Sequence, residues 1–353
     1  IYDTVLDAMG RTPLIRLNRL CEPDAAEILV KYEGINVGGS VKTRTAWQMI
    51  EAAEKRGDIG PDSIIVEPTS GNQGVGLALV CAVKGYAARI IMPDSVSEER
   101  RKLVRHYGAD VIVIHDDGDI GKCIAECIAT AERLAAADPR VYVPQQFENE
   151  DNLFAHKYHT ALEIVEDVEG PIHGFCSGIG TGGTISGVGQ ILKRLYPDVE
   201  IWAVEPENAA ILSGGGIGTH LQMGIGDGLI PAILDQGIYD DICIVSDEEA
   251  LACARELARE DGALDLGRDL RVDGLAAGVR YDDVQGASSG APRARSVGSP
   301  AARRPVRRGI VNSVYTLYTH HIHTYAHCQR ESFREKEEKR RRGREESAPG
   351  CFT

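Results

Sequence analysis

The chain has 353 residues, 43% of them hydrophobic, so it can form two domains of ordinary size and bury a real core. Its net charge of −14 argues against a general nucleic-acid or membrane-surface binder, and the absence of an 18-residue apolar run argues against a membrane span. The nine cysteines are scattered, which is typical of reduced thiols in a cytoplasmic protein. Cys123 and Cys127 are four residues apart, but no second pair or nearby histidine completes a zinc site.

Short apolar runs alternate with amphipathic stretches as far as about Glu260. The predicted strands are 27–33, 63–68, 88–93, 110–115, 172–178 and 200–206. The predicted helices are 41–56, 73–84, 96–107, 120–136, 152–167, 184–194 and 247–260. Several of the strands are apolar almost throughout, as buried parallel strands are. The alternation therefore predicts an α/β protein with parallel sheets.

The composition changes after Gly262. The segment 263–353 is rich in Ala, Arg, Ser and Pro, and from Ala291 to Thr353 it carries 14 Lys and Arg against 6 Asp and Glu. Such a composition cannot close a core, so we predict a disordered basic tail. Its basic run could contact nucleic acid and its histidines could bind a metal, but a tail without function is the preferred interpretation.

Lys42 stands at the start of a predicted amphipathic helix, after Gly-Gly-Ser and Val41. Ser40 is a good N-cap, and apolar residues then recur at helical spacing. A helix N-terminus carries partial positive charge, so an ammonium group there is slightly disfavoured. One interpretation is a solvated surface lysine. The other is a lysine kept easy to deprotonate for use as a nucleophile.

The first glycine-containing turn lies in "EPTSGNQGVGLALV", residues 67–80. A strand ends near Glu67, and a helix begins near Gln73. Free N–H groups at such a helix start bind anions, and the hydroxyls of Thr69 and Ser70 suit a carboxylate. Asn72 offers a neutral amide that could hydrogen-bond a phenolate oxygen or an imine. The alternative is an ordinary capped turn.

The second glycine-rich turn, in residues 174–195, again follows a strand and precedes a helix. Gly180, Thr181, Gly182, Gly183 and Thr184 form a nest of backbone donors with two hydroxyls, which suits a phosphate monoester.

The same turn also matches a different fingerprint. Gly178, Gly180 and Gly183 spell G-x-G-x-x-G, and Glu205 ends the next strand where an acid would hold a nicotinamide ribose. An NAD-dependent dehydrogenase is therefore an alternative, but it leaves Lys42 and the 69–72 loop unexplained.

Three features occur together in the chain: the helix-start lysine, the Thr-Ser-Gly-Asn loop and the Gly-Thr-Gly-Gly-Thr turn. The set resembles the fold type II pyridoxal-phosphate enzymes, specifically the cysteine synthase (O-acetylserine sulfhydrylase) and cystathionine β-synthase group. The segments that also resemble this group are "GRTPLIRLNRL" (10–20), "YVPQQFENEDNLFAHKYHTALEI" (142–164) and "LQMGIGDGLIPAIL" (221–234). The likeness runs from residue 1 to about 262.

The resemblance implies two open parallel-sheet domains, as in the tryptophan synthase β-subunit, with the cofactor in the cleft between them. The smaller domain would be 36–146, and the larger would combine 1–35 with 147–262. Lys42 would bond covalently to the aldehyde of pyridoxal 5′-phosphate, and Asn72 would hydrogen-bond its ring hydroxyl. The groups expected to hold the cofactor phosphate are Gly180, Thr181, Gly182, Gly183 and Thr184. Those expected at the substrate are Thr69, Ser70, Gly71 and Gln146 on its α-carboxylate, with the loop from Gly224 to Gly228 bordering the site.

The implied chemistry is β-replacement on an activated serine, with Lys42 moving the α-proton and the cofactor ring as electron sink. Within the group, "GIGDGLIP" and the lack of a haem-binding extension favour cysteine synthase, which makes cysteine and acetate from O-acetylserine and sulfide. A cystathionine β-synthase reaction on serine and homocysteine is the alternative. The resemblance also implies a homodimer and a possible partner in the C-terminus of serine acetyltransferase, with no metal.

The C-terminus departs from the family pattern. After Gly262 the chain lacks the expected Gly-Ile-Ser-Ser-Gly turn, although "GASSGA" at 286–291 resembles it, and it lacks the terminal Pro-Asp-Ser/Thr-Gly segment. In the family a hydroxyl of that segment bonds the pyridine nitrogen. A frameshift, a retained intron or a truncated gene copy would explain the change. An inactive protein of the same fold is therefore a further hypothesis.

Overall fold

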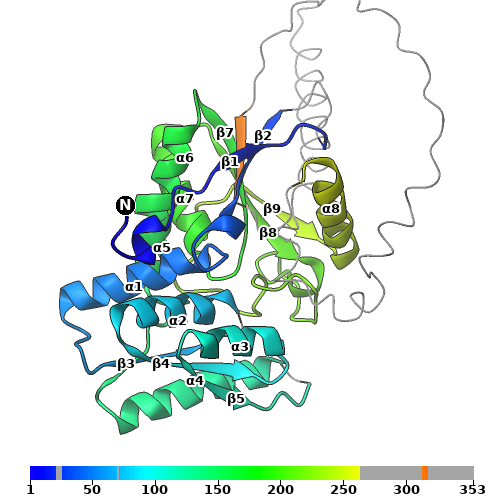
Figure 1. The fold of residues 1–353 in the computed structure, drawn as a ribbon. Helices are drawn as coiled ribbons and strands as arrows, with labels where there is room; N and C mark the ends of the chain where they lie inside the picture. Colours follow the sequence, from blue (N-terminus) through cyan, green and yellow to red (C-terminus); the bar gives the residue numbers. More distant parts are fainter. Residues whose placement is uncertain (21–25, 70, 119, 263–311, 317–353) are drawn as a thin grey trace, which may run out of the picture.

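A computed structural model describes residues 1–20, 26–69, 71–118, 120–262 and 312–316. These residues form two sheets, each covered by helices, as Figure 1 shows. The smaller sheet has four strands in the order β5-β4-β3-β6, all parallel. The larger has six in the order β1-β2-β10-β7-β8-β9, in which only the β1–β2 pair is antiparallel. Within the described ranges, no helix is long and apolar enough to cross a membrane.

The smaller sheet comes from the first half of the chain. Its strands are β3 (Ile64–Pro68), β4 (Ala87–Pro93), β5 (Asp110–Ile114) and β6 (Val141–Tyr142), and its helices are α1 (Lys42–Arg56), α2 (Asn72–Lys84), α3 (Glu98–His106) and α4 (Ile120–Ala137). Successive strand side chains point to opposite faces, so Ile65 packs with α1, α2 and α3 while Ile64 and Val66 pack with α4. Figure 1 shows α4 alone on its side of this sheet. Cys123 and Cys127 of α4 belong to this second core, and no cluster that could hold a metal occurs among the described residues.

The larger sheet takes strands from both ends of the described chain. They are β1 (Leu14–Arg16), β2 (Glu27–Lys31), β7 (Ile172–Gly178), β8 (Glu200–Pro206), β9 (Asp241–Val245) and β10 (Asn312–Thr316). The helices are α5 (Glu150–Ala155), α6 (Ala161–Asp167), α7 (Gly183–Leu195) and α8 (Asp247–Glu260), with short 3-10 turns η1 (Val5–Ala8), η2 (Glu33–Ile35) and η4 (Glu207–Ala209). One face packs against α6 and α7 and the other against α8.

The strand β10 comes from the segment for which the sequence predicts a disordered tail. It lies between β2 and β7 and pairs with both in parallel, with Val314 opposite Leu29 and Phe175. Five residues of that segment therefore complete the centre of the larger sheet. The prediction for the rest of 263–353 falls outside the described residues.

Two other features differ from the predicted elements. The single helix expected over 152–167 is divided by a π-helical turn, η3 (His156–Thr160), between α5 and α6. The strands β6 and β9 are not among the predicted ones, and β6 is only two residues long.

Candidate active site

A cavity of about 360 Å³ lies between the two halves of the molecule. Its wall includes the first residue of α1, the end of β3, the start of α2, one side of α4 between residues 124 and 135, the segments 141–143 and 145–148, Thr181 and part of the loop 224–229. Seven of the twelve predicted site residues line it: Lys42, Thr69, Gly71, Asn72, Gln146, Thr181 and Gly224. Of the other five, Gly180, Gly182, Gly183 and Thr184 belong to the turn and helix start around Thr181, and Ser70 lies outside the described residues.

Lys42 is the first residue of α1 and is 9% exposed. Val41 already has helical angles, but the Ser40 hydroxyl still accepts the Lys42 N–H at 3.3 Å. The preceding Gly38 has φ +82°, and a Cβ there would lie 2.4 Å from Thr43 Oγ1, so the tight approach to the helix requires glycine. Gly76 of α2 is equally constrained, because a Cβ would lie 2.9 Å from the Lys42 carbonyl oxygen. These contacts fix the lysine backbone at the cavity wall.

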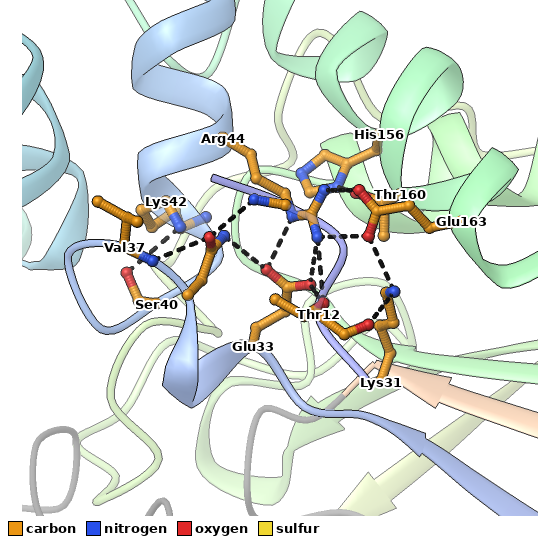
Figure 2. Close-up of polar contacts among 12 residues, drawn as sticks. Thr12, Lys31, Glu33, Val37, Ser40, Lys42, Arg44, His156, Thr160 and Glu163 are labelled. Carbon is orange, nitrogen blue, oxygen red and sulfur yellow. Dashed lines mark hydrogen bonds and ion pairs between the residues drawn. The ribbon is translucent and has the colours of Figure 1, made fainter. Parts of the chain in front are cut away.

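A buried charge network joins the start of α1 to β2, η2 and α6 (Figure 2). Arg44 donates to Glu33 through Nε at 2.8 Å and Nη2 at 2.9 Å, and to Glu163 of α6 through Nη1 at 2.6 Å and Nη2 at 2.7 Å. Lys31, fully buried on β2, lies 2.8 Å from the second Glu163 oxygen. Thr12 donates to Glu33 at 2.6 Å. The network therefore pairs the cations of Arg44 and Lys31 with the carboxylates of Glu33 and Glu163. Arg44 stands two residues after Lys42, so the network fixes the helix close to that lysine.

The pKa values in this network favour the charged forms. Burial opposes ionisation of Glu163, but its hydrogen bonds and ion pairs with Arg44 and Lys31 outweigh burial and lower its pKa to about 2. Burial likewise acts against the guanidinium, but the two carboxylates raise the pKa of Arg44. Glu163 and Arg44 are therefore both ionised near neutral pH.

The first predicted turn forms as expected at the end of β3. Gly71 precedes α2, and its N–H donates to Thr69 Oγ1 at 3.2 Å. Thr69, Gly71 and Asn72 face the cavity at the N-terminus of α2, where N–H groups lack helical partners. Gln73, buried beneath them, accepts the Thr45 hydroxyl at 2.7 Å. This end of the cavity suits a carboxylate.

The second turn is built so closely that side chains are excluded. Gly182 has φ +79°, and a Cβ there would lie 2.8 Å from Leu234 Cβ. A Cβ on Gly180 would lie 2.5 Å from the Gly224 carbonyl oxygen, and one on Gly183 would lie 2.4 Å from Asn152 Oδ1. The turn leads into α7, whose 13 residues provide a full helix N-terminus for an anion.

Two buried threonine hydroxyls flank this helix start. Thr181 Oγ1 accepts from Asn152 Nδ2 at 3.0 Å, and Thr184 Oγ1 lies 3.2 Å from His156 Nε2. Burial, together with the charges of Lys42 and Arg44, lowers the pKa of His156 well below its usual value. The imidazole is therefore neutral at pH 7, and the site offers an anion hydroxyl and N–H donors without a charged histidine.

The acid of the dinucleotide fingerprint is engaged elsewhere. Glu205 is buried and accepts the N–H groups of Leu212 at 2.7 Å and Ser213 at 3.1 Å, as well as the Ser213 hydroxyl at 3.0 Å. Its carboxylate closes the 211–213 turn, and it does not line the cavity. The geometry thus gives no support to the ribose-binding role that the dehydrogenase alternative requires.

Comparison with known proteins decides between these interpretations. The family model for "Pyridoxal-phosphate dependent enzyme" matches residues 5–264. The chain belongs to this family. Its fold is that of the fold type II pyridoxal-phosphate enzymes, and the dehydrogenase alternative is wrong.

The relatives of the chain within this family include several cysteine synthases. The chain is 44% identical over 263 residues to the cysteine synthase of Staphylococcus aureus, which covers 74% of this chain and 83% of the relative. A hydrogen sulfide-producing enzyme from Fusobacterium nucleatum is 42% identical with a TM-score of 0.70, over 74% of this chain and 87% of that one. Cysteine synthase from Entamoeba histolytica is 36% identical with a TM-score of 0.70, over 74% and 78% of the two chains. The chain is a pyridoxal-phosphate-dependent enzyme of the cysteine synthase type.

The residues present fit pyridoxal phosphate. A lysine faces the cavity, and the turn before α7 presents the free N–H groups of a helix N-terminus, which suit a phosphate. Thr181 and Thr184 add buried hydroxyls, and Asn72 adds a neutral amide.

Several residues around the site were not singled out from the sequence. Asn152 joins the two halves of the site, because its Nδ2 donates to the Gln146 carbonyl at 2.8 Å as well as to Thr181. Asp227 lines the cavity, and burial raises its pKa against the opposing charge of Lys42. Both stand in segments that carry the family resemblance, which was the available signal. For Glu67 and Arg44 the sequence held no signal of their own; only the residues next to them had been singled out.

Proposed function

We propose that this protein catalyses β-replacement on O-acetylserine with sulfide, giving cysteine and acetate. The observation that carries the proposal is one cavity that places Lys42 with the Thr69–Asn72 turn and Gln146, next to the anion-binding start of α7. The cysteine synthase relatives support the choice of reaction. In this reaction the Cβ–O bond breaks with its electrons leaving on acetate, and sulfide forms the new Cβ–S bond.

Each residue of the cavity has a role in this proposal. Pyridoxal phosphate, when bound, supplies an electron sink for the α-carbon. The N-terminus of α7, with Thr181 and Thr184, holds its phosphate, and the Asn72 amide holds its ring hydroxyl. Lys42 Nζ anchors the cofactor and, once displaced by the substrate amine, takes the α-proton and later returns it.

The substrate is oriented by its α-carboxylate. We propose that the hydroxyls of Thr69 and Ser70, the N–H groups at the start of α2 and the Gln146 amide bind it. The Gly224–Gly228 loop would border the site on the side away from Thr69. Gly226 N–H donates to the Ile179 carbonyl at 2.9 Å and so holds this loop next to the turn at residues 180–184. This grip would keep the Cα–H bond within reach of Lys42 Nζ.

The finer predictions from the resemblance belong to the same proposal. They are the domain boundaries at residues 36 and 146, a homodimer, a cytoplasmic location and binding of the serine acetyltransferase C-terminus. Inactivity is the second candidate, because the chain lacks the Pro-Asp-Ser/Thr-Gly segment after Gly262.

One preparation tests these candidates. The protein purified with pyridoxal phosphate should absorb visible light through its lysine-bound cofactor, and Lys42→Ala should lose that band. Cysteine formation from O-acetylserine and sulfide then distinguishes the enzyme from a cofactor-binding protein without turnover. Replacing these substrates with serine and homocysteine tests the cystathionine β-synthase alternative. A colourless protein that takes up no pyridoxal phosphate contradicts the proposal.

A further inference from the structure

Glu67 is a buried carboxylate in the cavity wall to which the proposed reaction assigns no part. It lies near the end of β3, two residues before Thr69, and is 1% exposed. Among the described residues no lysine, arginine or histidine forms an ion pair with it. Its partners are two consecutive backbone groups: Gln145 N–H at 2.9 Å from Oε2 and Gln146 N–H at 3.0 Å from Oε1.

These two N–H groups converge because the chain turns sharply at this point. Gln145 has φ +58°, a left-handed conformation that a residue with a side chain rarely adopts. Successive N–H groups beside such a residue form a concave anion-binding nest. The Glu67 carboxylate occupies this nest with one oxygen for each donor. The carboxylate therefore holds the chain in a conformation that glutamine disfavours.

The turn sets the position of Gln146. On the other side of this residue, its carbonyl oxygen accepts Asn152 Nδ2 at 2.8 Å, so the Gln146 backbone is held from both directions. Its side chain is buried and lines the cavity. Glu67 is thus linked to both parts of the proposed carboxylate site, to Thr69 through the chain and to Gln146 through the hydrogen bonds.

We propose that Glu67 is a positioning residue for substrate recognition: its carboxylate holds the Gln145–Gln146 turn so that the Gln146 amide meets the α-carboxylate of the amino acid. The inference rests on the proposed function, because it concerns the grip on that carboxylate. Glutamine at position 67 has the same shape but offers one acceptor and one NH₂ donor, so one of the two N–H groups loses its partner.

The test measures ligand binding to the protein loaded with pyridoxal phosphate. L-Alanine has the α-carboxylate but no leaving group, and ethylamine has the same carbon chain without the carboxylate. Calorimetric titration at pH 8, above the pKa of about 7 to which burial raises Glu67, gives the ratio of their affinities. In Glu67→Gln we expect L-alanine to bind about 10- to 100-fold more weakly, the range for loss of a charge-assisted hydrogen bond, and ethylamine to change less than about threefold.

Three further variants isolate the cause. Gln146→Ala should weaken L-alanine binding similarly, and combining it with Glu67→Gln should add little, because both act on one interaction. Gln145→Gly removes the conformational cost of the turn, so adding it to Glu67→Gln should recover part of the affinity. Glu150→Gln removes a negative charge from an exposed residue nearby that does not line the cavity, and it should leave the ratio unchanged.

Three results would overturn the inference. If the preference for L-alanine survives in Glu67→Gln, the positioning role is wrong while the proposed function stands. An equal loss for both ligands, without rescue by Gln145→Gly, would show that Glu67 merely supports the fold. A wild-type protein without preference for L-alanine would contradict the proposed function at its substrate site, and the positioning role with it.

Discussion

Replacing Arg44 by methionine should destabilise the protein by about 3–5 kcal/mol, the cost of breaking a buried ion pair from one side. The variant keeps most of the apolar stem and removes the guanidinium. Glu33, with a side chain 2% exposed, is then left with Thr12 at 2.6 Å and Asn36 at 3.1 Å as its hydrogen-bond donors. Glu163 is 15% exposed and retains Lys31 at 2.8 Å, so the larger part of the loss should come from Glu33.

Urea denaturation at pH 7 measures this loss at a fixed concentration of pyridoxal phosphate, because ligand binding itself shifts apparent stability. Adding Glu33→Gln to Arg44→Met should restore part of it, since the uncompensated charge is gone. Arg133→Met is the matched control: that pair with Glu126 is exposed on both sides and should contribute less than about 1 kcal/mol. Equal effects of Arg44→Met and Arg133→Met would refute the reasoning.

Three further variants test other parts of the site. Burial raises the pKa of Glu67 from 4.5 to about 7, so this group stabilises the fold below pH 4.5 and loses that effect as the pH rises through 7. The free energy of unfolding should therefore fall by about 3 kcal/mol between pH 4.5 and pH 8. Denaturation of Glu67→Gln at the two pH values should lack this fall. Gly182→Ala should destabilise by about 2–4 kcal/mol, because alanine is strained at φ +79° and its Cβ would lie 2.8 Å from Leu234; an unchanged Tm would contradict this. Asn152→Ala should weaken retention of pyridoxal phosphate on dialysis, because Thr181 loses its donor, whereas wild-type retention would exclude such a role.

The sequence was sufficient for those parts of the site that depend on local pattern. Strand, glycine turn and helix follow each other at Thr69 and again at Thr181, so the positions of both turns could be predicted from the sequence. The apolar runs predicted as strands form β3, β4, β7 and β8, which are buried because helices cover both faces of a parallel sheet.

The remaining features depend on contacts between distant parts of the chain. Arg44 meets Glu163 from 119 residues away, and Glu67 meets Gln145 from 78 residues away, so neither interaction has a local signal. The π-helical turn at His156–Thr160 replaces i→i+4 by i→i+5 hydrogen bonds over only five residues, and no single residue type marks such a turn in the sequence. The strand β10 lies in a run of β-forming residues, "SVYTLYT" (313–319), but the polar and basic composition around this run favoured disorder in the prediction. Its pairing with β2 and β7 on both sides depends on distant parts of the chain.

The most direct test of the account is cysteine formation by the purified protein loaded with pyridoxal phosphate. With O-acetylserine and sulfide we expect cysteine and acetate in equal amounts from the wild-type chain, and none above background from Lys42→Ala. Turnover that persists in Lys42→Ala would contradict the assignment of the lysine. A wild-type protein that binds the cofactor with its visible band but forms no cysteine would contradict the proposed reaction.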